Sequence, residues 1–229
     1  MTRLLAVDTS AGRGSVALLD GGSVITDYSD EARSHTRRLE PMINGLLSRA
    51  GLRLGDLDAL AFGAGPGSFT GLRVTAGLVQ GLAFGLQLPV VPVSSLRAMA
   101  HAVHGRLEGP AEVAVARDAR MGELYWSLYR VTPEAVVETL LPDSLVSPAA
   151  LALPGDTRAW LGVGDGWLLR DSMPDAVLAR VETVIPDVVP EAGAIARLAE
   201  TLLHQGEWGG AEAVQPVYLR DDVAWQTSA

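Results

Sequence analysis

The stretch LLAVDTSAGRGSVALL, residues 4–19, predicts the fold of this chain because it has the pattern of a strand, a turn and a second strand. One apolar run ends at Asp8, and a second begins at Ser15. Gly12 and Gly14 lie between them, where a tight turn needs residues that accept positive φ. Asp20 and the two glycines after it signal a hairpin into a third strand, so we expect a three-stranded meander at the start of the chain.

The same pattern returns 110 residues later in EVAVARDARMGELYWSLY, residues 112–129. There Asp118 and Gly122 stand between two strands as Asp8 and Gly12 do in the first unit. Between and after the two units, apolar spacing and capping residues predict further elements. Helices are expected at 39–50, 68–85, 94–104 and 191–204, and strands at 57–62, 89–93 and 159–163.

Strands that alternate with helices predict an α/β fold. Two halves that each open with a strand, a turn and a strand favour a duplicated fold, as in the actin, Hsp70 and sugar-kinase group with its ribonuclease H-like subdomains. We expect an N-terminal subdomain at 1–108 and a smaller C-terminal subdomain at 109–229, with a tail that can pack back on the first.

The segment GAGPGSFTGLR, residues 63–73, is the richest in glycine. It follows an apolar strand, and Ser68 is placed to cap the helix that comes next. A glycine turn before a helix N-terminus exposes unpaired N–H groups that can bind an anion. The segment lacks the lysine of a P-loop and the spacing of a dinucleotide fingerprint, so a tight strand-to-helix turn is the stronger interpretation.

Composition narrows the function classes. The chain has 229 residues, 48% of them hydrophobic and 20% charged, which is typical of a folded globular protein. It has no cysteine, which excludes disulfides and thiolate metal sites, and we expect a cytoplasmic protein with no membrane segment. All 18 basic residues are arginine, and the net charge is −9. Because nucleic-acid binding needs a basic surface, the chain alone is a poor candidate for holding tRNA or DNA.

Five segments together resemble the TsaB family, also called YeaZ-like: LLAVDTSAGRGSVAL, HTRRLEPMI, GAGPGSFTGLRVTAGLVQGLAFG, ARDARMGELYW and QPVYLRDDVAW. They occur in order from Leu4 to Trp225. The resemblance implies a bacterial cytosolic protein that is needed, with the related TsaD subunit and the ATPase TsaE, to make threonylcarbamoyladenosine in tRNA. It also implies a non-catalytic partner, since TsaD carries out the transfer, and one that pairs with TsaD and can self-associate.

A nucleotide site is one alternative for the two turns. In the duplicated fold, paired hairpins grip phosphates through backbone N–H groups, and two further glycines would lie near the adenine. The other alternative is that these are inherited turns that hold strands together, and we favour weak or absent ATP binding, with ATP or ADP at a partner interface left open. The candidate residues are Asp8, Ser10, Gly12, Gly14, Asp118, Arg120, Gly122, Gly164 and Gly166.

A metal-dependent hydrolase is the main competing hypothesis, because relatives of this family were once described as metallopeptidases. His101 and His104 are the close pair of histidines, and on a helix they would lie with Arg97 opposite the apolar face. A catalytic zinc normally has three protein ligands, and no carboxylate joins this pair locally. We therefore expect a solvated helix face and no metal. A small-molecule kinase on the same fold is a further alternative, and no G-x-S-x-G elbow supports a serine nucleophile.

A partner interface is expected on two helices. Gly77, Gly81 and Gly85 recur every four residues and share one helix face, and small residues in register let two backbones approach closely. The glycine face either contacts TsaD or a second copy of the chain, or packs on the chain's own sheet. The neighbouring helix would add Leu39, Met42, Ile43 and Leu46 to the interface.

Overall fold

The computed structural model describes residues 1–29, 35–156 and 159–220, so the end of the QPVYLRDDVAW segment lies outside the described residues. It contains two five-stranded sheets with helices on their faces. The strands are β1 (Arg3–Asp8), β2 (Gly14–Asp20), β3 (Ser23–Ser29), β4 (Ala59–Gly65), β5 (Val90–Ser94), β6 (Ala111–Arg120), β7 (Glu123–Val131), β8 (Val137–Val146), β9 (Trp160–Val163) and β10 (Val181–Ile185). The α-helices are α1 (His35–Ala50), α2 (Phe69–Leu86), α3 (Ser95–His101), α4 (Asp175–Leu178) and α5 (Ala192–His204). Three short 3₁₀ helices also matter below: η2 (His104–Arg106), η4 (Asp165–Ser172) and η5 (Ala211–Ala213).

The two sheets repeat one topology. The first has the order β3-β2-β1-β4-β5, and the second has the order β8-β7-β6-β9-β10. In each sheet, the three strands that come first in the sequence form an antiparallel meander. The two strands that come later extend the sheet as parallel strands. The repeat confirms the predicted duplicated α/β fold.

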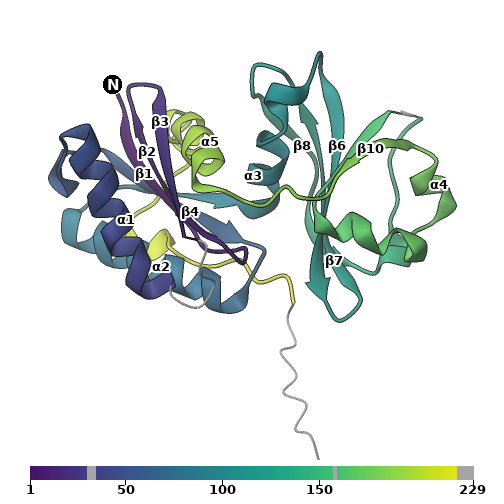
Figure 1. The fold of residues 1–229 in the computed structure, drawn as a ribbon, viewed down its shortest axis with the longest axis horizontal. Coiled ribbons are helices and arrows are strands. Elements are labelled where there is room, and N and C mark those ends of the chain that lie inside the picture. Colours follow the sequence, from purple (N-terminus) through teal and green to yellow (C-terminus); the bar gives the residue numbers. More distant parts are fainter. Residues whose placement is uncertain (30–34, 157–158, 221–229) are drawn as a thin grey trace, which may run out of the picture.

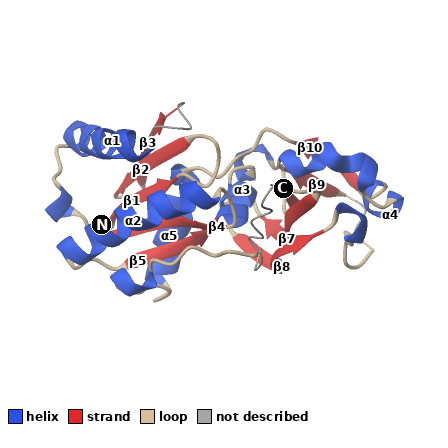
Figure 2. Cartoon of the chain, turned by 90° about the horizontal axis from the view of Figure 1, so that it is seen from below, coloured by secondary structure: helices blue, strands red, loops and turns tan. Residues whose placement is uncertain are grey.

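The elements form layers, seen edge-on in Figure 1 and from below in Figure 2. Helices α1 and α2 cover the outer face of the first sheet, and η4 and α4 cover the outer face of the second. Helices α3 and α5 lie between the sheets, where apolar residues of both sheets join them in one continuous core. Because this central core draws on both halves of the chain, the two lobes stabilise each other.

The last part of the chain belongs to the first lobe. Helix α5 packs on β1 and β2, and the N–H of Ala192 donates to Ser15 Oγ at 2.9 Å. Farther on, the N–H of Val217 donates to the carbonyl of Ala64 at 2.7 Å. The end of the predicted C-terminal subdomain at 109–229 therefore packs back on the first lobe, as the sequence allowed, and this return begins at α5.

The N-caps of the helices agree with the sequence, but the bounds of two helices differ from those expected. Ser68 Oγ accepts the N–H of Gly71, and Ser94 Oγ accepts the N–H of Arg97, so both predicted N-caps are confirmed. Helix α1 begins before the expected residue 39, which places Pro41 inside it. Helix α3 ends at His101, where we expected it to continue to residue 104.

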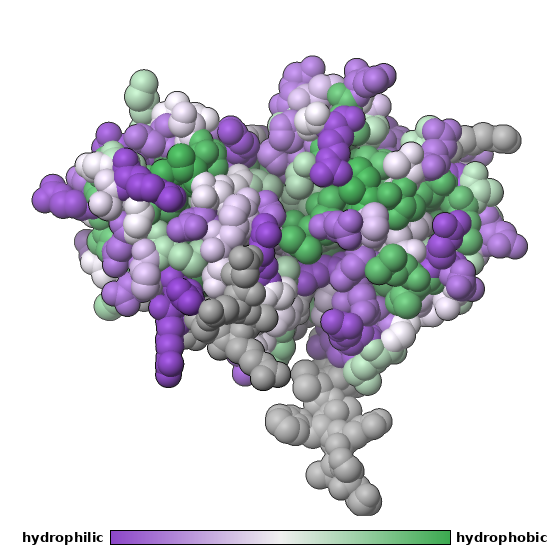
Figure 3. All heavy atoms as spheres, viewed as in Figure 1, coloured by the Kyte–Doolittle hydropathy of each residue, from purple (hydrophilic) through white to green (hydrophobic). Residues whose placement is uncertain are grey.

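Helix α2 resembles a membrane-spanning helix in length and composition, although the sequence led us to expect no membrane segment. By length and composition alone it could cross a bilayer, and it is the single such helix in the part of the chain described. Its residues Leu72, Val79 and Ala83 are buried against the first lobe, and its opposite side is exposed. The space-filling view in Figure 3 shows the two lobes touching through the middle of the molecule.

Candidate functional site

The first predicted turn, after β1, uses its polar groups internally. Asp8 Oδ2 accepts the N–H of Ser10 at 3.2 Å. The carbonyl of Ser10 accepts the N–H of Ser68 at 2.9 Å and Arg117 Nη2 at 2.8 Å. Ser10 Oγ accepts Ser95 Oγ–H at 3.1 Å, and both Asp8 and Ser10 are fully buried. These bonds favour the interpretation that the turn holds strands and lobes together.

The second turn repeats one hydrogen bond of the first. Asp118 Oδ1 accepts the N–H of Arg120 at 2.7 Å, the same two-residue step that joins Asp8 to Ser10. Here the turn is open: Arg120, Met121 and Gly122 are exposed and all have positive φ. Arg120 Nη1 forms an exposed ion pair with Asp118 at 3.0 Å. The two predicted turns therefore share this one hydrogen bond and differ in backbone conformation and in burial.

The remaining glycines of the predicted nucleotide site do not converge on a free space. A Cβ on Gly12 would meet nothing within 4 Å, and Gly14 is paired with Ser29 in the sheet. Gly164, at φ 102°, and Gly166 press against the backbone of β6 at Ala116, and a Cβ on Gly166 would lie 2.7 Å from the Ala116 carbonyl carbon. Gly164 and Gly166 therefore let η4 pack closely on β6.

The segment GAGPGSFTGLR is explained by close contact with the first turn. A Cβ on Gly63 would overlap Asp8 Oδ1, and a Cβ on Gly71 would overlap the carbonyl oxygen of Thr9. A Cβ on Gly67 would lie 2.6 Å from the carbonyl oxygen of Ser10. Only glycine permits this approach, so the segment is the tight strand-to-helix turn that the sequence favoured.

Asp8 is an unusual carboxyl group. It is completely buried, and its Oδ1 has no hydrogen-bond partner among the residues described. Burial raises the pKa of Asp8 to about 6, although the hydrogen bonds from Ser10 and the charge of Arg117 act in the opposite direction. The carboxylate form of Asp8 is therefore destabilised by the fold.

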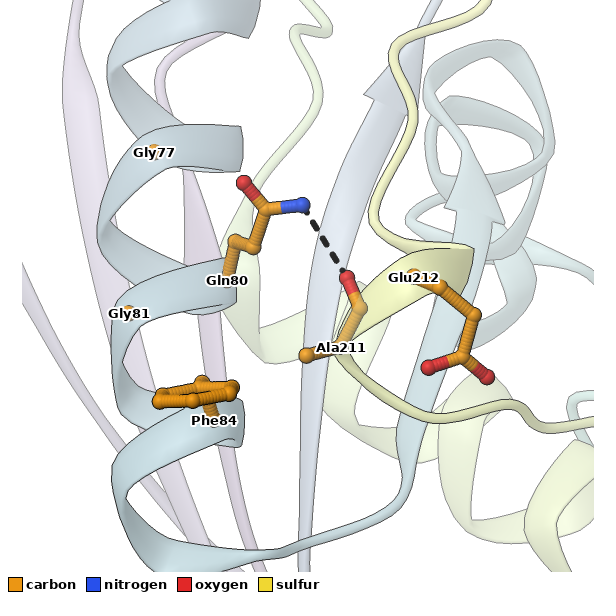
Figure 4. Close-up of a pocket in the computed structure, with 6 residues that line it drawn as sticks. All are labelled: Gly77, Gln80, Gly81, Phe84, Ala211 and Glu212. Carbon is orange, nitrogen blue, oxygen red and sulfur yellow. Dashed lines mark hydrogen bonds between the residues drawn. The ribbon is translucent and has the colours of Figure 1, made fainter.

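The glycine face of α2 is open. Gly77, Gly81 and Gly85 are exposed, and a Cβ on any of them would meet nothing within 4 Å. The alternative in which these glycines pack on the chain's own sheet is therefore wrong. Figure 4 shows the face beside η5, where Gln80 Nε2 donates to the carbonyl of Ala211 at 3.2 Å. Phe84, 81% exposed, stands at the end of this open groove of about 570 Å³.

The apolar residues of α1 have a different role from the one predicted. Leu39, Met42, Ile43 and Leu46 are buried in the core that α1 forms with the first sheet. Their assignment to a partner interface is corrected, because a side chain that fills the chain's own core has no surface left for a partner. On α1 and α2, the surface available to a partner is the outward side.

The chain was compared with known proteins. A family model described as "TsaD: tRNA N6-adenosine threonylcarbamoyltransferase" matches residues 29–159. The tRNA threonylcarbamoyladenosine biosynthesis protein TsaB of Escherichia coli strain K12 is 37% identical over 98% of this chain and 97% of its own length. The protein of the same name from Haemophilus influenzae is 38% identical, over 97% of this chain and 95% of its own length. The chain belongs to the TsaB family.

Solved structures agree with this placement. YeaZ from Pseudomonas aeruginosa superposes with a TM-score of 0.88 at 41% identity, and the match covers 96% of this chain and 100% of that one. A second structure with the same values is described as an uncharacterized protein with similarity to peptidase YEAZ. The two-lobed fold is therefore that of the TsaB family. A peptidase would need catalytic groups, and the histidines are the candidates that the sequence offered for a metal-dependent one.

His101 of this TsaB-family chain does not lie on a solvated face, whereas His104 is partly exposed. His101 is 3% exposed, so that expectation was wrong, and its ring lies 4.7 Å from the ring of His104 in η2. Burial, together with the charges of His104, Arg197 and Arg97, lowers the pKa of His101 to about 4. The described residues contain no group of three or more His, Cys, Asp or Glu side chains that could hold a metal ion. The absence of a bound metal stays a prediction.

Two glycines of α2 provide a matched test of the close approach. Gly71→Ala places a methyl group against Thr9 and should lower the free energy of unfolding by about 1–3 kcal/mol, as overpacking does. Gly77→Ala adds the same methyl group in open space and should raise it by about 0.5–1 kcal/mol, because glycine weakens a helix interior. Urea unfolding of both variants measures the difference. Equal effects of the two changes would contradict the assignment.

A second prediction concerns Asp8 and pH. The folded-state pKa of Asp8, about 6, exceeds the ordinary value of 3.8. The contribution of Asp8 to the free energy of unfolding of the wild type is therefore greatest below pH 3.8 and is lost as pH rises through 6. Asp8→Asn cannot ionise, so its stability relative to wild type should rise by roughly 3 kcal/mol between pH 4 and 7.

Urea unfolding at several pH values measures this dependence for wild type, Asp8→Asn and the control Asp118→Asn. The control changes the equivalent aspartate of the second turn, whose side chain reaches solvent. A stability difference between wild type and Asp8→Asn that stays flat from pH 4 to 7 would show that Asp8 is not the destabilised carboxylate.

Proposed function

We propose that this chain is a non-catalytic subunit in the synthesis of threonylcarbamoyladenosine in tRNA. In this role it pairs with a TsaD-like transferase in the bacterial cytoplasm and acts together with a TsaE-like ATPase. The observation that carries the proposal is its similarity over nearly the full length to two proteins named for this biosynthesis. The match to the TsaD family model supports a common origin with the transferase itself.

The non-catalytic role is supported by what the buried polar groups do. The N–H, carbonyl and hydroxyl of Ser10 all bond within the chain, and Gly164 and Gly166 serve packing. For the same reason we propose that the isolated chain binds ATP weakly or not at all. Calorimetric titration with ATP and Mg²⁺ measures this, and micromolar affinity would overturn that part of the proposal. The hydrolase and kinase alternatives have no specific observation in their favour.

The charge of the chain bears on how tRNA is held. A net charge of −9 repels phosphates, and specific tRNA binding depends strongly on basic side chains. We therefore assign most tRNA contacts to the partner. This chain contributes by stabilising or activating the transferase.

The docking surface we propose is the outward face of α2 together with η5. This surface combines three exposed glycines with the exposed ring of Phe84, and the glycines allow a partner helix to approach the α2 backbone closely. A large aromatic side chain beside such a groove is typical of the anchors of protein interfaces. A second copy of the chain could use the same surface, which would make self-association and transferase binding mutually exclusive.

Reconstitution of tRNA modification from purified components tests the proposed function. With the transferase, the ATPase and the enzyme that supplies the threonylcarbamoyl-adenylate, product should form only when this chain is added. The control adds the same chain after heat denaturation. Full modification of tRNA without the chain would refute the proposal.

The docking surface is tested by Gly81→Leu. The leucine side chain would fill the groove and keep a partner backbone away, so binding to the transferase should fall at least tenfold in titration calorimetry. Because Gly81 faces open space, the variant should still unfold cooperatively. Ala176→Leu is the matched control, since Ala176 is an exposed residue of α4 in the other lobe and should leave binding unchanged. Unaltered binding by Gly81→Leu would place the interface elsewhere.

A further inference from the structure

The side chain of Arg117 crosses from one lobe to the other. Arg117 lies on β6 in the second sheet, yet its Nη2 donates to the carbonyl of Ser10 in the first lobe at 2.8 Å. A Cβ on Gly67 would lie 3.1 Å from Nη1 of the same guanidinium. The tip of the side chain is therefore held between the turn after β1 and the turn before α2.

The surroundings of this guanidinium are acidic on both sides. Burial lowers the pKa of the Arg117 guanidinium, and the charges of Asp165 at the start of η4 and Asp8 at the end of β1 act in the opposite direction by favouring its charged form. Nη1 is buried and has no hydrogen-bond partner among the described residues. A buried cation costs free energy unless neighbouring charges and hydrogen bonds offset the loss of water. Arg117 thus draws compensation from both lobes at once.

Neighbouring bonds fix the elements on each side of the guanidinium. Ser95 Oγ–H, in the first turn of α3, donates to Ser10 Oγ at 3.1 Å, so the Ser10 turn meets α3 and Arg117 together. The N–H of Asp118 donates to Asp165 Oδ1 at 3.0 Å, which fixes η4 against the strand that carries Arg117. The elements on both sides of the guanidinium, the Ser10 turn and the strand that carries Arg117, are therefore held in place by further bonds.

We propose that Arg117 is a built-in cation that locks the two lobes in one relative orientation without any bound ligand. Loss of the lock would let the lobes rotate about the central helices while each sheet stays intact. The lock goes beyond the proposed function, because it would fix the shape of the chain whatever partner it meets. A partner that docks on α2 would then meet a preformed arrangement of both lobes and would not have to order them.

The absence of cysteine makes a direct distance measurement possible. Ser48→Cys on α1 and Ala176→Cys on α4 place two spin labels at exposed positions on opposite lobes of the full chain. Electron–electron resonance should give one narrow distance distribution in the otherwise wild-type protein. Arg117→Met keeps an unbranched apolar side chain but removes the charge and the donors, and it should broaden the distribution at least twofold.

Arg120→Met is the matched control, because Arg120 lies on the same strand and its guanidinium is exposed. It should leave the distribution narrow. An unchanged distribution in Arg117→Met, or equal broadening in Arg120→Met, would overturn the proposal.

If Arg117→Met does not fold, Arg117→Lys provides the test, because lysine keeps the charge and lacks the paired nitrogens of the guanidinium. Hydrogen exchange of the Ser68 amide, which donates to the same Ser10 carbonyl, should then accelerate at least tenfold while amides in the middle of β1 and β2 do not change. Exchange at Ser68 equal to that of wild type would show that Arg117 does not hold the lobes together.

Discussion

The structure depends on the contact between the glycine segment at 63–73 and the turn that follows β1. Gly63, Gly67 and Gly71 each lie where a Cβ would collide with an atom of that turn. The hydroxyl of Thr9 completes the contact with bonds of 2.6 Å to the carbonyl of Gly71 and to Thr75 Oγ1. This contact sets where α2 begins and brings the Ser10 carbonyl within reach of Arg117. It also turns the outward face of α2 away from the sheet.

The same contact explains why a turn with the appearance of a phosphate site is occupied by the protein itself. A buried carbonyl can accept two hydrogen bonds, and that of Ser10 accepts one from each lobe. Leaving such a group unsatisfied costs about 1–3 kcal/mol. The second turn repeats the hydrogen bond from its aspartate to the N–H two residues on, but it takes positive φ at three successive residues and stays exposed. The two halves therefore share one local bond of the turn, and long-range packing gives the two turns different surroundings.

Local patterns predicted much of this fold. The strand–turn–strand units, the glycine turn, the caps at Ser68 and Ser94 and most helices follow from residue type and spacing. Two strands escaped prediction: β8 contains Pro142 and mixes polar with apolar residues, and β10 lies at a sheet edge with most of its residues exposed.

Contacts between residues far apart in the sequence could not be predicted from local patterns. The spacing in α1 identified which side of the helix is apolar, but it could not show that the chain's own sheet covers that side. His101 looked solvated because no local signal reveals the core between the lobes that buries it. The bond between Arg117 and Ser10 joins residues 107 positions apart, and neither sequence segment points to the other.

The two groups of glycines in and before α2 differ in one physical respect. Glycine in a helix interior costs about 0.5–1 kcal/mol relative to alanine. For Gly71 this cost is offset inside the chain, because any larger residue would break the contact with Thr9. No described contact offsets it for Gly77, Gly81 and Gly85, although alanine would fit at all three positions. If the regular spacing of these glycines has a physical cause, that cause lies outside the single chain, and a second backbone packed closely against α2 would supply it.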